Sequence, residues 1–197
     1  MSPIHVSMLL WGAWVLSWGA AALWSRRTVA SAPLAPEMLY RMVTVVGAFM
    51  LFWAAGLRPA ALQAAAFFNP FWSLPDWAAW LATALVAAGF GFCWWARVSL
   101  GALWSSSVTR KESHEIVRRG PYALVRHPIY TGLMLASFAF AAQTGAVVGI
   151  AGAAVMTLGF WIKARLEEQL LSETLGAAYA DYRRSTPMLI PFLPRAH

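Results

Sequence analysis

The residues best suited to chemistry lie between Arg118 and Gly132, where cationic, imidazole and phenol side chains precede an apolar stretch. Pro128 suits the first turn of a helix, because a residue there needs no backbone N–H. Arg126 and His127 then lie just before that turn, beside unpaired backbone N–H groups and the positive end of the helix dipole. Such a position favours an anionic group such as a carboxylate. Basic residues beside a membrane helix also occur as a simple topology signal, and both interpretations stay open at this point.

A second polar cluster, residues 163–168, ends the next apolar stretch. Turn residues between the two apolar stretches predict a helical hairpin. Because a hairpin brings its two ends together, we expect His127 to lie near Lys163. Tyr130 and Glu167 should join them, and such a convergence of polar groups at a membrane boundary is typical of a binding site. Lys163 and Glu167 are also spaced for an ordinary ion pair along one helix, and the tyrosines also fit interfacial anchors.

The sequence lacks the motifs that mark several other kinds of site. His114 and His127 are candidate metal ligands, but the sequence has no H-x-x-x-H or H-E-x-x-H, and Cys93 is its single cysteine. We therefore expect no metal site and no internal disulfide, and we interpret Cys93 as a small buried apolar residue. The G-x-S-x-G motif of serine hydrolases and the glycine-rich motifs of phosphate and dinucleotide sites are also missing.

The composition indicates an integral membrane protein. Of the 197 residues, 60% are hydrophobic and 12% are charged, and the mean hydropathy is +0.57. Soluble domains carry about 25% charged residues. A net charge of +7 and a pI near 10.3 would suit nucleic acid, but the basic residues cluster beside apolar helices. Attraction to anionic headgroups explains them better, so we expect membrane lipids and not nucleic acid as partners.

The hydrophobic pattern predicts an all-α integral membrane protein with about five membrane helices, the last two a short hairpin. The predicted helices are Val6–Trp24, Leu39–Leu57, Trp77–Ala96, Ile129–Ala142 and Ala146–Lys163. The first is a retained helix and not a signal peptide, because no positive charge precedes it. The fourth would be about 21 Å long, too short to cross a bilayer upright. The proline-rich and aromatic segment Arg58–Asp76 should lie along the headgroups.

The positions of the charges predict the orientation. Segments 25–41, 97–128 and 163–197 share one face and hold 14 of the 15 Lys and Arg residues, which leaves Arg58 alone on the other side. The positive-inside rule places that face, with all the candidate chemistry, in the cytoplasm and the N-terminus outside, as in a bacterial-type inner membrane. Small residues should let the last helices approach closely: Gly145, Gly149, Gly152, Ala153 and Gly159.

Four blocks in the second half of the chain form a pattern: Gly120–Tyr122, Arg126–Gly132, Glu167–Leu171 and Gly176–Tyr182. Their order and spacing resemble the isoprenylcysteine carboxyl methyltransferase (ICMT) family over about residues 95–194. The wider group of phospholipid and thiol methyltransferases shares parts of it, and sterol reductases carry a similar R-H-P-x-Y-x-G segment. The chain therefore divides into three N-terminal membrane helices, 1–96, and a catalytic half, 97–197, with the cofactor-binding loop, the hairpin and the C-terminal segment.

The resemblance implies methyl transfer from S-adenosyl-L-methionine, with the cofactor in a cytoplasmic pocket. Carried over residue by residue, the cofactor site comprises His114, Glu115, Ile116, Val117, Tyr122, His127, Pro128, Ile129, Tyr130 and Glu167. The catalytic residues that it implies are Lys163, Glu167 and Arg126. Family members have arginine at the position of Lys163, and lysine lacks the two-pronged geometry that arginine offers a carboxylate.

By the same resemblance, the acceptor is the carboxylate of a prenylated cysteine or a small analogue of one. Such a lipophilic or lipidated molecule would enter sideways from the bilayer. Because Lys163 departs from the family pattern, an aminolipid headgroup or a small thiol is the alternative acceptor. A sterol-type reductase that uses a nicotinamide cofactor and a non-enzymatic membrane scaffold are alternatives of other classes. The sequence leaves the oligomeric state open.

Overall fold

The computed structural model describes residues 1–23, 28–31, 34–56, 70–101, 104, 109–111 and 116–192. Five α-helices lie within them: α1 (Pro3–Ala22), α2 (Leu34–Ala54), α3 (Asp76–Leu100), α4 (Pro128–Thr144) and α5 (Val147–Ser185). The other elements are the 3-10 helix η4 (Gly120–Ala123) and the antiparallel strands β1 (Thr28–Ser31) and β2 (Thr109–Lys111). The predicted helical class is confirmed. The two strands are a correction to it, and they are too short to show a hydrophobic alternation in the sequence.

Four of the described helices, α1, α2, α3 and α5, are long and apolar enough to cross a membrane, which indicates an integral membrane protein. Helix α4 has 17 residues, or about 26 Å, and is shorter than a typical span. It is nevertheless longer than the predicted stretch 129–142, because it begins at Pro128 and ends only before Gly145.

Prolines in the first turn let two helices begin earlier than the hydrophobic pattern predicts. Helix α1 begins at Pro3 rather than at Val6. Helix α2 begins at Leu34, with Pro36 in its first turn, rather than at Leu39. Proline is tolerated there because the first N–H groups of a helix have no partner within the helix. The loop before α2 is therefore shorter than predicted.

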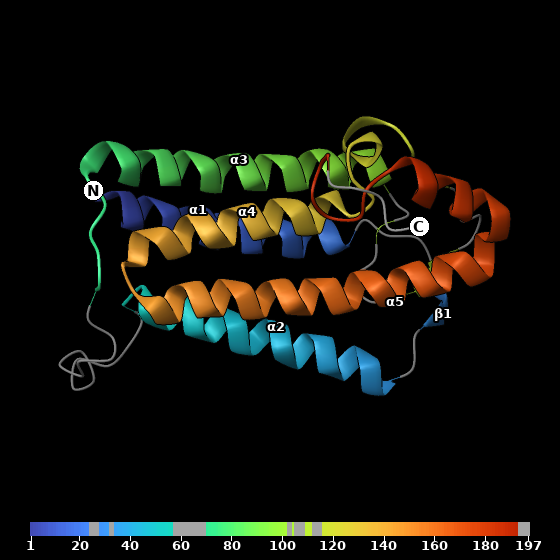
Figure 1. Cartoon of the computed structure of the whole chain (residues 1–197), viewed down its shortest axis with the longest axis horizontal. Helices are drawn as coiled ribbons and strands as arrows, with labels where there is room; N and C mark the ends of the chain where they lie inside the picture. Colours follow the sequence, from blue (N-terminus) through green and yellow to red (C-terminus); the bar gives the residue numbers. More distant parts are fainter. Residues whose placement is uncertain are drawn as a thin grey trace.

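The long helices lie side by side in a bundle, with α1, α3 and α4 on one side and α2 and α5 on the other (Figure 1). Aromatic and aliphatic side chains from all five described helices fill the core between them, among them Trp11, Leu51, Phe90, Phe140 and Phe160. Outward side chains such as Leu16 are apolar as well. Helices that are apolar all round are typical of proteins whose solvent is lipid.

Two pairs of glycines allow close helix contacts. A Cβ atom added to Gly152 would lie 2.6 Å from the backbone N of Leu51 and 2.7 Å from the carbonyl O of Gly47, so α5 and α2 touch through their backbones. A Cβ atom added to Gly89 would lie 2.5 Å from the carbonyl O of Gly132, which joins α3 and α4 in the same way. Small residues favour such contacts in lipid, where helices gain little from hydrophobic burial. The role predicted for Gly152 is confirmed.

The turn between α4 and α5 is held by the segment that precedes α3. Gly145 has a φ of 66°, a conformation that glycine adopts without strain, and its carbonyl accepts the N–H of Phe71 at 2.7 Å. The indole N–H of Trp72 donates to the carbonyl of Ala142 at 2.9 Å. Residues 58–69 of the predicted interfacial segment lie outside the described residues, so its place along the headgroups stays a prediction.

Helix α5 is far longer than predicted. The sequence predicts a helix end at Lys163, where the chain turns polar, but α5 continues for several turns beyond it. It continues because its buried face does: Phe160, Ala164 and Glu168 are spaced four residues apart and are all buried. At Gly176, with φ 50° and ψ −125°, the helix changes direction and returns over the end of the bundle (Figure 1).

The candidate chemistry lies at one end of the bundle (Figure 1). There α1 and α3 end, α2 and α4 begin, and the polar half of α5 projects. As far as the chain is described, segments 25–41, 97–128 and 163–197 thus gather at one end, as predicted. That this end faces the cytoplasm stays a prediction.

We expect Gly152→Ala to destabilise the protein by about 1–3 kcal/mol, because the new Cβ atom meets backbone atoms of α2 that cannot move without separating the helices. Gly91→Ala in α3 is the matched control, since nothing lies within 4 Å of its added Cβ atom. It should leave the unfolding midpoint unchanged or raise it. Thermal unfolding of the purified protein in detergent measures both. Equal losses in the two variants would contradict a backbone contact between α2 and α5.

Candidate functional site

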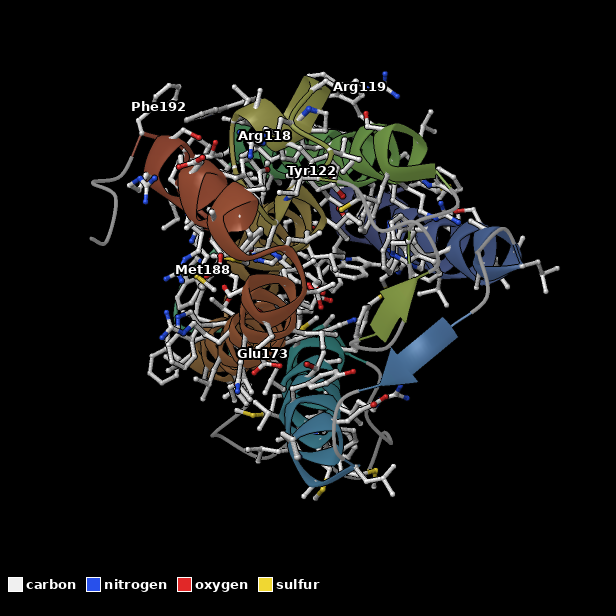
Figure 2. All side chains as sticks on the ribbon, turned by 90° about the vertical axis from the view of Figure 1, so that its right-hand side faces the viewer. Arg118, Arg119, Tyr122, Glu173, Met188 and Phe192 are labelled. Atoms are coloured by element: carbon white, nitrogen blue, oxygen red, sulfur yellow. The ribbon has the colours of Figure 1, made fainter. Side chains whose placement is uncertain are left out.

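Side chains from η4, α4 and α5 meet at the end of the bundle that faces the viewer in Figure 2. Gly120, with φ 59°, begins η4, and Tyr122 follows as a buried residue. The hydroxyl of Tyr182 in α5 donates to the carbonyl of Tyr122 at 2.6 Å. Burial raises the pKa of the Tyr122 hydroxyl. Pro128 begins α4 as predicted, and Arg118 and Arg126 of the basic segment before it donate to Ala178 and Glu168 of α5.

Glu167 is the polar centre of the hairpin's open end. The hydroxyl of Tyr130 donates to Glu167 Oε1 at 2.7 Å, and His127 Nδ1 lies 3.3 Å from Glu167 Oε2. Lys163 Nζ lies 4.0 Å from Glu167 Oε1 and makes the longest of the three contacts. The predicted meeting of these four residues is confirmed. The ion pair along the helix is the loosest part of the cluster.

Aromatic rings flank Lys163. Its Nζ lies 5.5 Å from the ring centroid of Tyr40 in α2 and 5.6 Å from that of Tyr130 in α4. Tyr130 stacks on His127, with ring centroids 5.6 Å apart, and on Phe160, with centroids 5.8 Å apart. Ring faces attract a cation without neutralising it. The rings of Tyr40 and Tyr130 thus help to hold the ammonium beside Glu167.

A second carboxylate is buried beside the first. Glu168 is 3% exposed, and its Oε1 accepts a hydrogen bond from Arg126 Nε at 2.6 Å and lies 3.3 Å from His127 Nε2. Arg183 Nε lies 3.8 Å from the other carboxylate oxygen. A buried carboxylate is stable only with such cationic partners, because its desolvation is strongly unfavourable.

His127 connects the two carboxylates, through Nδ1 to Glu167 and through Nε2 to Glu168. Both ring nitrogens act as donors only in the imidazolium form. Burial by itself lowers the pKa of His127, but hydrogen bonds to the two carboxylates and their charges outweigh burial and raise the pKa above 6.5. The cluster therefore favours a charged imidazole.

The chain after α5 returns across the start of α4. The N–H of Arg126 donates to the carbonyl of Pro187 at 2.9 Å, and the N–H of His127 donates to that of Met188 at 3.1 Å. The sequence predicts an anionic group beside the unpaired N–H groups of the first turn of α4. The N–H groups of Arg126 and His127, which precede that turn, are paired with the C-terminal segment because it packs on this turn, which no local pattern reveals. These two N–H groups are therefore not available to an anion.

A cavity lies between the end of α3, the segment around η4 and the polar half of α5. Its lining residues are Leu100, Ile116, Val117, Tyr122, Arg126, Leu171, Leu175, Tyr179 and Tyr182. The Tyr179 hydroxyl is buried and has no hydrogen-bond partner among the described residues. An apolar cavity with a few polar groups is typical of small-molecule sites, and this hydroxyl is available to a polar atom of a ligand.

The structure brings the predicted site residues together in two adjoining groups. The cavity wall contains Ile116, Val117, Tyr122 and Arg126. The polar cluster contains His127, Tyr130, Lys163 and Glu167. Pro128 and Ile129 form the first turn of α4, where Pro128 is buried and Ile129 packs against the core. His114 and Glu115 lie outside the described residues.

Three residues belong to the site in the structure but are not among the site residues that the sequence predicts. In the sequence, Glu168 stands out only as the neighbour of Glu167, because its burial depends on the continuation of α5 beyond Lys163. Tyr179 lines the cavity through the return of α5 after its change of direction. Tyr40 comes from α2, and no local pattern places it beside Lys163.

Metal ligands do not gather anywhere in the described part of the chain, where no three His, Cys, Asp or Glu side chains are grouped to hold an ion. Cys93 is fully buried in the core, and its thiol donates to the carbonyl of Ile129 at 3.3 Å. The interpretation of Cys93 as a small buried residue is confirmed.

Comparison with known proteins shows which family the sequence of this region matches. Residues 80–173 match the model of the isoprenylcysteine carboxyl methyltransferase (ICMT) family. The matched stretch contains most of α3, all of η4 and α4, and α5 as far as Glu173, so it includes both site carboxylates. The resemblance inferred from the sequence motifs is confirmed.

Curated relatives are similar to part of the chain. A methanethiol S-methyltransferase of Crocosphaera subtropica is 39% identical over 72 residues, which are 36% of this chain and 28% of that protein. Protein-S-isoprenylcysteine O-methyltransferase B of Arabidopsis thaliana is 30% identical over 87 residues, 44% of each chain. A nickel-cobalt-cadmium resistance protein of Alcaligenes xylosoxydans is 32% identical over 119 residues, 58% of this chain and 53% of its own. The chain thus spans about half or less of the length of these relatives.

We expect Glu168→Gln to destabilise the protein by about 3–5 kcal/mol, because Arg126 and His127 lose a buried counter-charge. Asp181→Asn is the control, since it removes a carboxylate from an exposed pair with Arg184 and should cost less than about 1 kcal/mol. Unfolding in detergent compares the two variants with the wild type. A loss as small for Glu168→Gln as for the control would show that this carboxylate does not hold the site together.

Proposed function

Since residues 80–173 carry the sequence of the ICMT family, we propose that the chain is an integral-membrane methyltransferase that uses S-adenosyl-L-methionine and methylates a lipophilic acceptor. The observation that carries the proposal is the cluster of Tyr130, Lys163 and Glu167 at the hairpin's open end, next to a cavity with apolar walls. The cluster suits a reaction between charged groups, and the cavity suits a flat aromatic base.

The residues of the cavity fit the chemistry of the cofactor. Adenine needs an apolar slot, which Ile116 and Val117 help to form, and the buried Tyr179 hydroxyl suits a hydrogen bond to a ring nitrogen or a ribose hydroxyl. Glu167 suits the amino group of the cofactor and Arg126 its carboxylate. When bound, S-adenosyl-L-methionine supplies a methyl group activated by a sulfonium charge.

The side chains of the polar cluster have different roles in the proposed reaction. Tyr130 presents a ring face, which stabilises positive charge on the sulfonium side. Lys163 attracts the anionic acceptor, which needs no general base once it is ionised. His127 contacts both Glu167 and Glu168, and these contacts keep the polar cluster in place. In-line methyl transfer depends mainly on such positioning and on the exclusion of water.

We propose the carboxylate of a prenylated cysteine, or of a small analogue, as the acceptor, entering from the bilayer. A small thiol is the second candidate, because the compact charge of Lys163 suits a thiolate as well as a carboxylate. The name of the Crocosphaera subtropica relative, a methanethiol S-methyltransferase, favours the same candidate. In this proposal the site faces the cytoplasm, because segments 25–41, 97–128 and 163–197, whose described parts gather at that end, hold 14 of the 15 Lys and Arg residues of the sequence.

Calorimetric titration tests the cofactor. We expect S-adenosylhomocysteine to bind the wild type, and His127→Ala and Glu167→Ala each to abolish binding, because both remove part of the polar cluster. Arg184→Gln, at an exposed position, should bind as the wild type does. NADPH should not bind. Binding of NADPH alone would contradict the methyltransferase, and unchanged affinity in both site variants would contradict the location of the pocket.

Methyl transfer from labelled cofactor tests the acceptor side. We expect Lys163→Gln to lower the rate by about tenfold or more while the affinity for S-adenosylhomocysteine stays within about twofold, because the charge acts on the acceptor. Lys163→Arg should keep activity on a carboxylate. Prenylcysteine analogues, small thiols and aminolipids are compared as acceptors. Equal rates for the wild type and Lys163→Gln would show that Lys163 does not hold the acceptor.

A further inference from the structure

A groove on the outer side of α5 has no part in the proposed methyl transfer. It has a volume of about 510 Å³ and runs along α5 from Trp161 to Glu173, with Arg183 on its far side. Its described walls do not include Lys163 or Glu167. The groove is therefore a separate feature on the other side of the helix from the reaction centre.

The groove crosses the level at which α5 changes from apolar to polar. Along the exposed side of the helix the residues are Leu158, Trp161, Arg165, Gln169 and Glu173. Trp161 is 47% exposed, and the guanidinium carbon of Arg165 lies 5.9 Å from its ring centroid. An exposed tryptophan followed by an arginine one turn later is typical of the membrane–water interface. This pattern predicts that the groove lies at the depth of lipid headgroups.

The polar part of the groove presents charges of both signs. Arg165 makes no ion pair with any described residue, and Arg183 Nε lies 3.8 Å from Glu168 Oε2, beyond hydrogen-bond distance. The carboxylate of Glu173 accepts one long hydrogen bond, from Gln169 Nε2 at 3.4 Å. A ligand that carries both a phosphate and an ammonium group matches these charges.

The remaining walls are apolar and lie toward the membrane. Trp161, Ile162 and Leu166 form them. A charged headgroup above apolar walls matches the two ends of a phospholipid. We propose that this groove binds phosphatidylethanolamine, with its phosphate between Arg165 and Arg183 and its ammonium at Glu173. An anionic headgroup without an amine leaves Glu173 unmatched and next to negative charge, so the groove selects the zwitterion.

Glu168 connects the bound lipid with the site. It contributes to the wall of the groove, while its Oε1 accepts the hydrogen bond from Arg126 on the side of the cavity. A phosphate that fixes Arg183 also restrains Glu168, which lies 3.8 Å from Arg183 Nε and accepts the hydrogen bond from Arg126. Bound phosphatidylethanolamine therefore stabilises the fold, and its addition should raise the unfolding midpoint.

Native mass spectrometry of the full chain tests this, with phosphatidylethanolamine, phosphatidylglycerol and phosphatidylcholine of matched acyl chains. We expect the wild type to retain phosphatidylethanolamine most strongly, because the quaternary ammonium of phosphatidylcholine has no N–H to donate to the carboxylate of Glu173. Arg165→Gln combined with Arg183→Gln should weaken it by about tenfold, because two charge-assisted contacts are lost. Glu173→Gln should remove the preference over phosphatidylglycerol. Arg184→Gln is the matched control, because Arg184 lies outside the groove and pairs with Asp181.

Arg165→Gln alone keeps the test decisive if the double variant fails to fold, since Arg165 is exposed and makes no ion pair with any residue that the structure describes. It should weaken phosphatidylethanolamine by about threefold and leave S-adenosylhomocysteine affinity unchanged. Retention of phosphatidylethanolamine by Arg165→Gln at the level of the wild type would overturn the proposal. Stronger retention of phosphatidylglycerol than of phosphatidylethanolamine by the wild type would overturn it as well.

Discussion

The buried pair of Arg126 and Glu168 connects three segments at the end of the bundle. Glu168 belongs to α5, Arg126 precedes α4, and Arg126 Nη1 donates further to the carbonyls of Arg183 and Thr186 in the returning C-terminal segment. Apolar contacts alone give membrane helices little preference for one arrangement, because lipid is as apolar as the side chains. A buried charge is stable only beside a group of opposite charge, because its desolvation is unfavourable. This requirement sets where α5, α4 and the C-terminal segment meet.

Two consecutive carboxylates can serve different purposes because of helix geometry. Neighbouring residues of a helix point about 100° apart, since a turn contains about 3.6 residues. Glu168 therefore reaches Arg126 in the interior, while Glu167 reaches Tyr130 and Lys163 at the hairpin's open end. His127 contacts both carboxylates and couples the structural pair to the candidate reaction centre. A change on the structural side would thus be felt at the reaction centre through one imidazole.

Those parts of the arrangement that depend on local patterns could be predicted from the sequence. Apolar runs located the helices, and the hairpin between them placed Tyr130 beside Glu167. The parts that depend on distant segments could not. The sequence does not show that a polar stretch after Lys163 stays helical, because this depends on the buried face of α5. The positions of Tyr40 and of the carbonyl of Pro187 depend on how α2 and the C-terminal segment pack.

The position of Lys163 suggests how the membrane itself could contribute to the proposed reaction. Its ammonium lies where α2, α4 and α5 meet, between the rings of Tyr40 and Tyr130, at the level where α5 changes from apolar to polar. The proposed acceptor, with a lipid tail and an ionised end, would lie across that level with its charge at the depth of Lys163. The bilayer would then supply part of the orientation that an enzyme in water must supply by binding. A short hairpin with few polar side chains is then sufficient, because the protein has to hold only the charged ends.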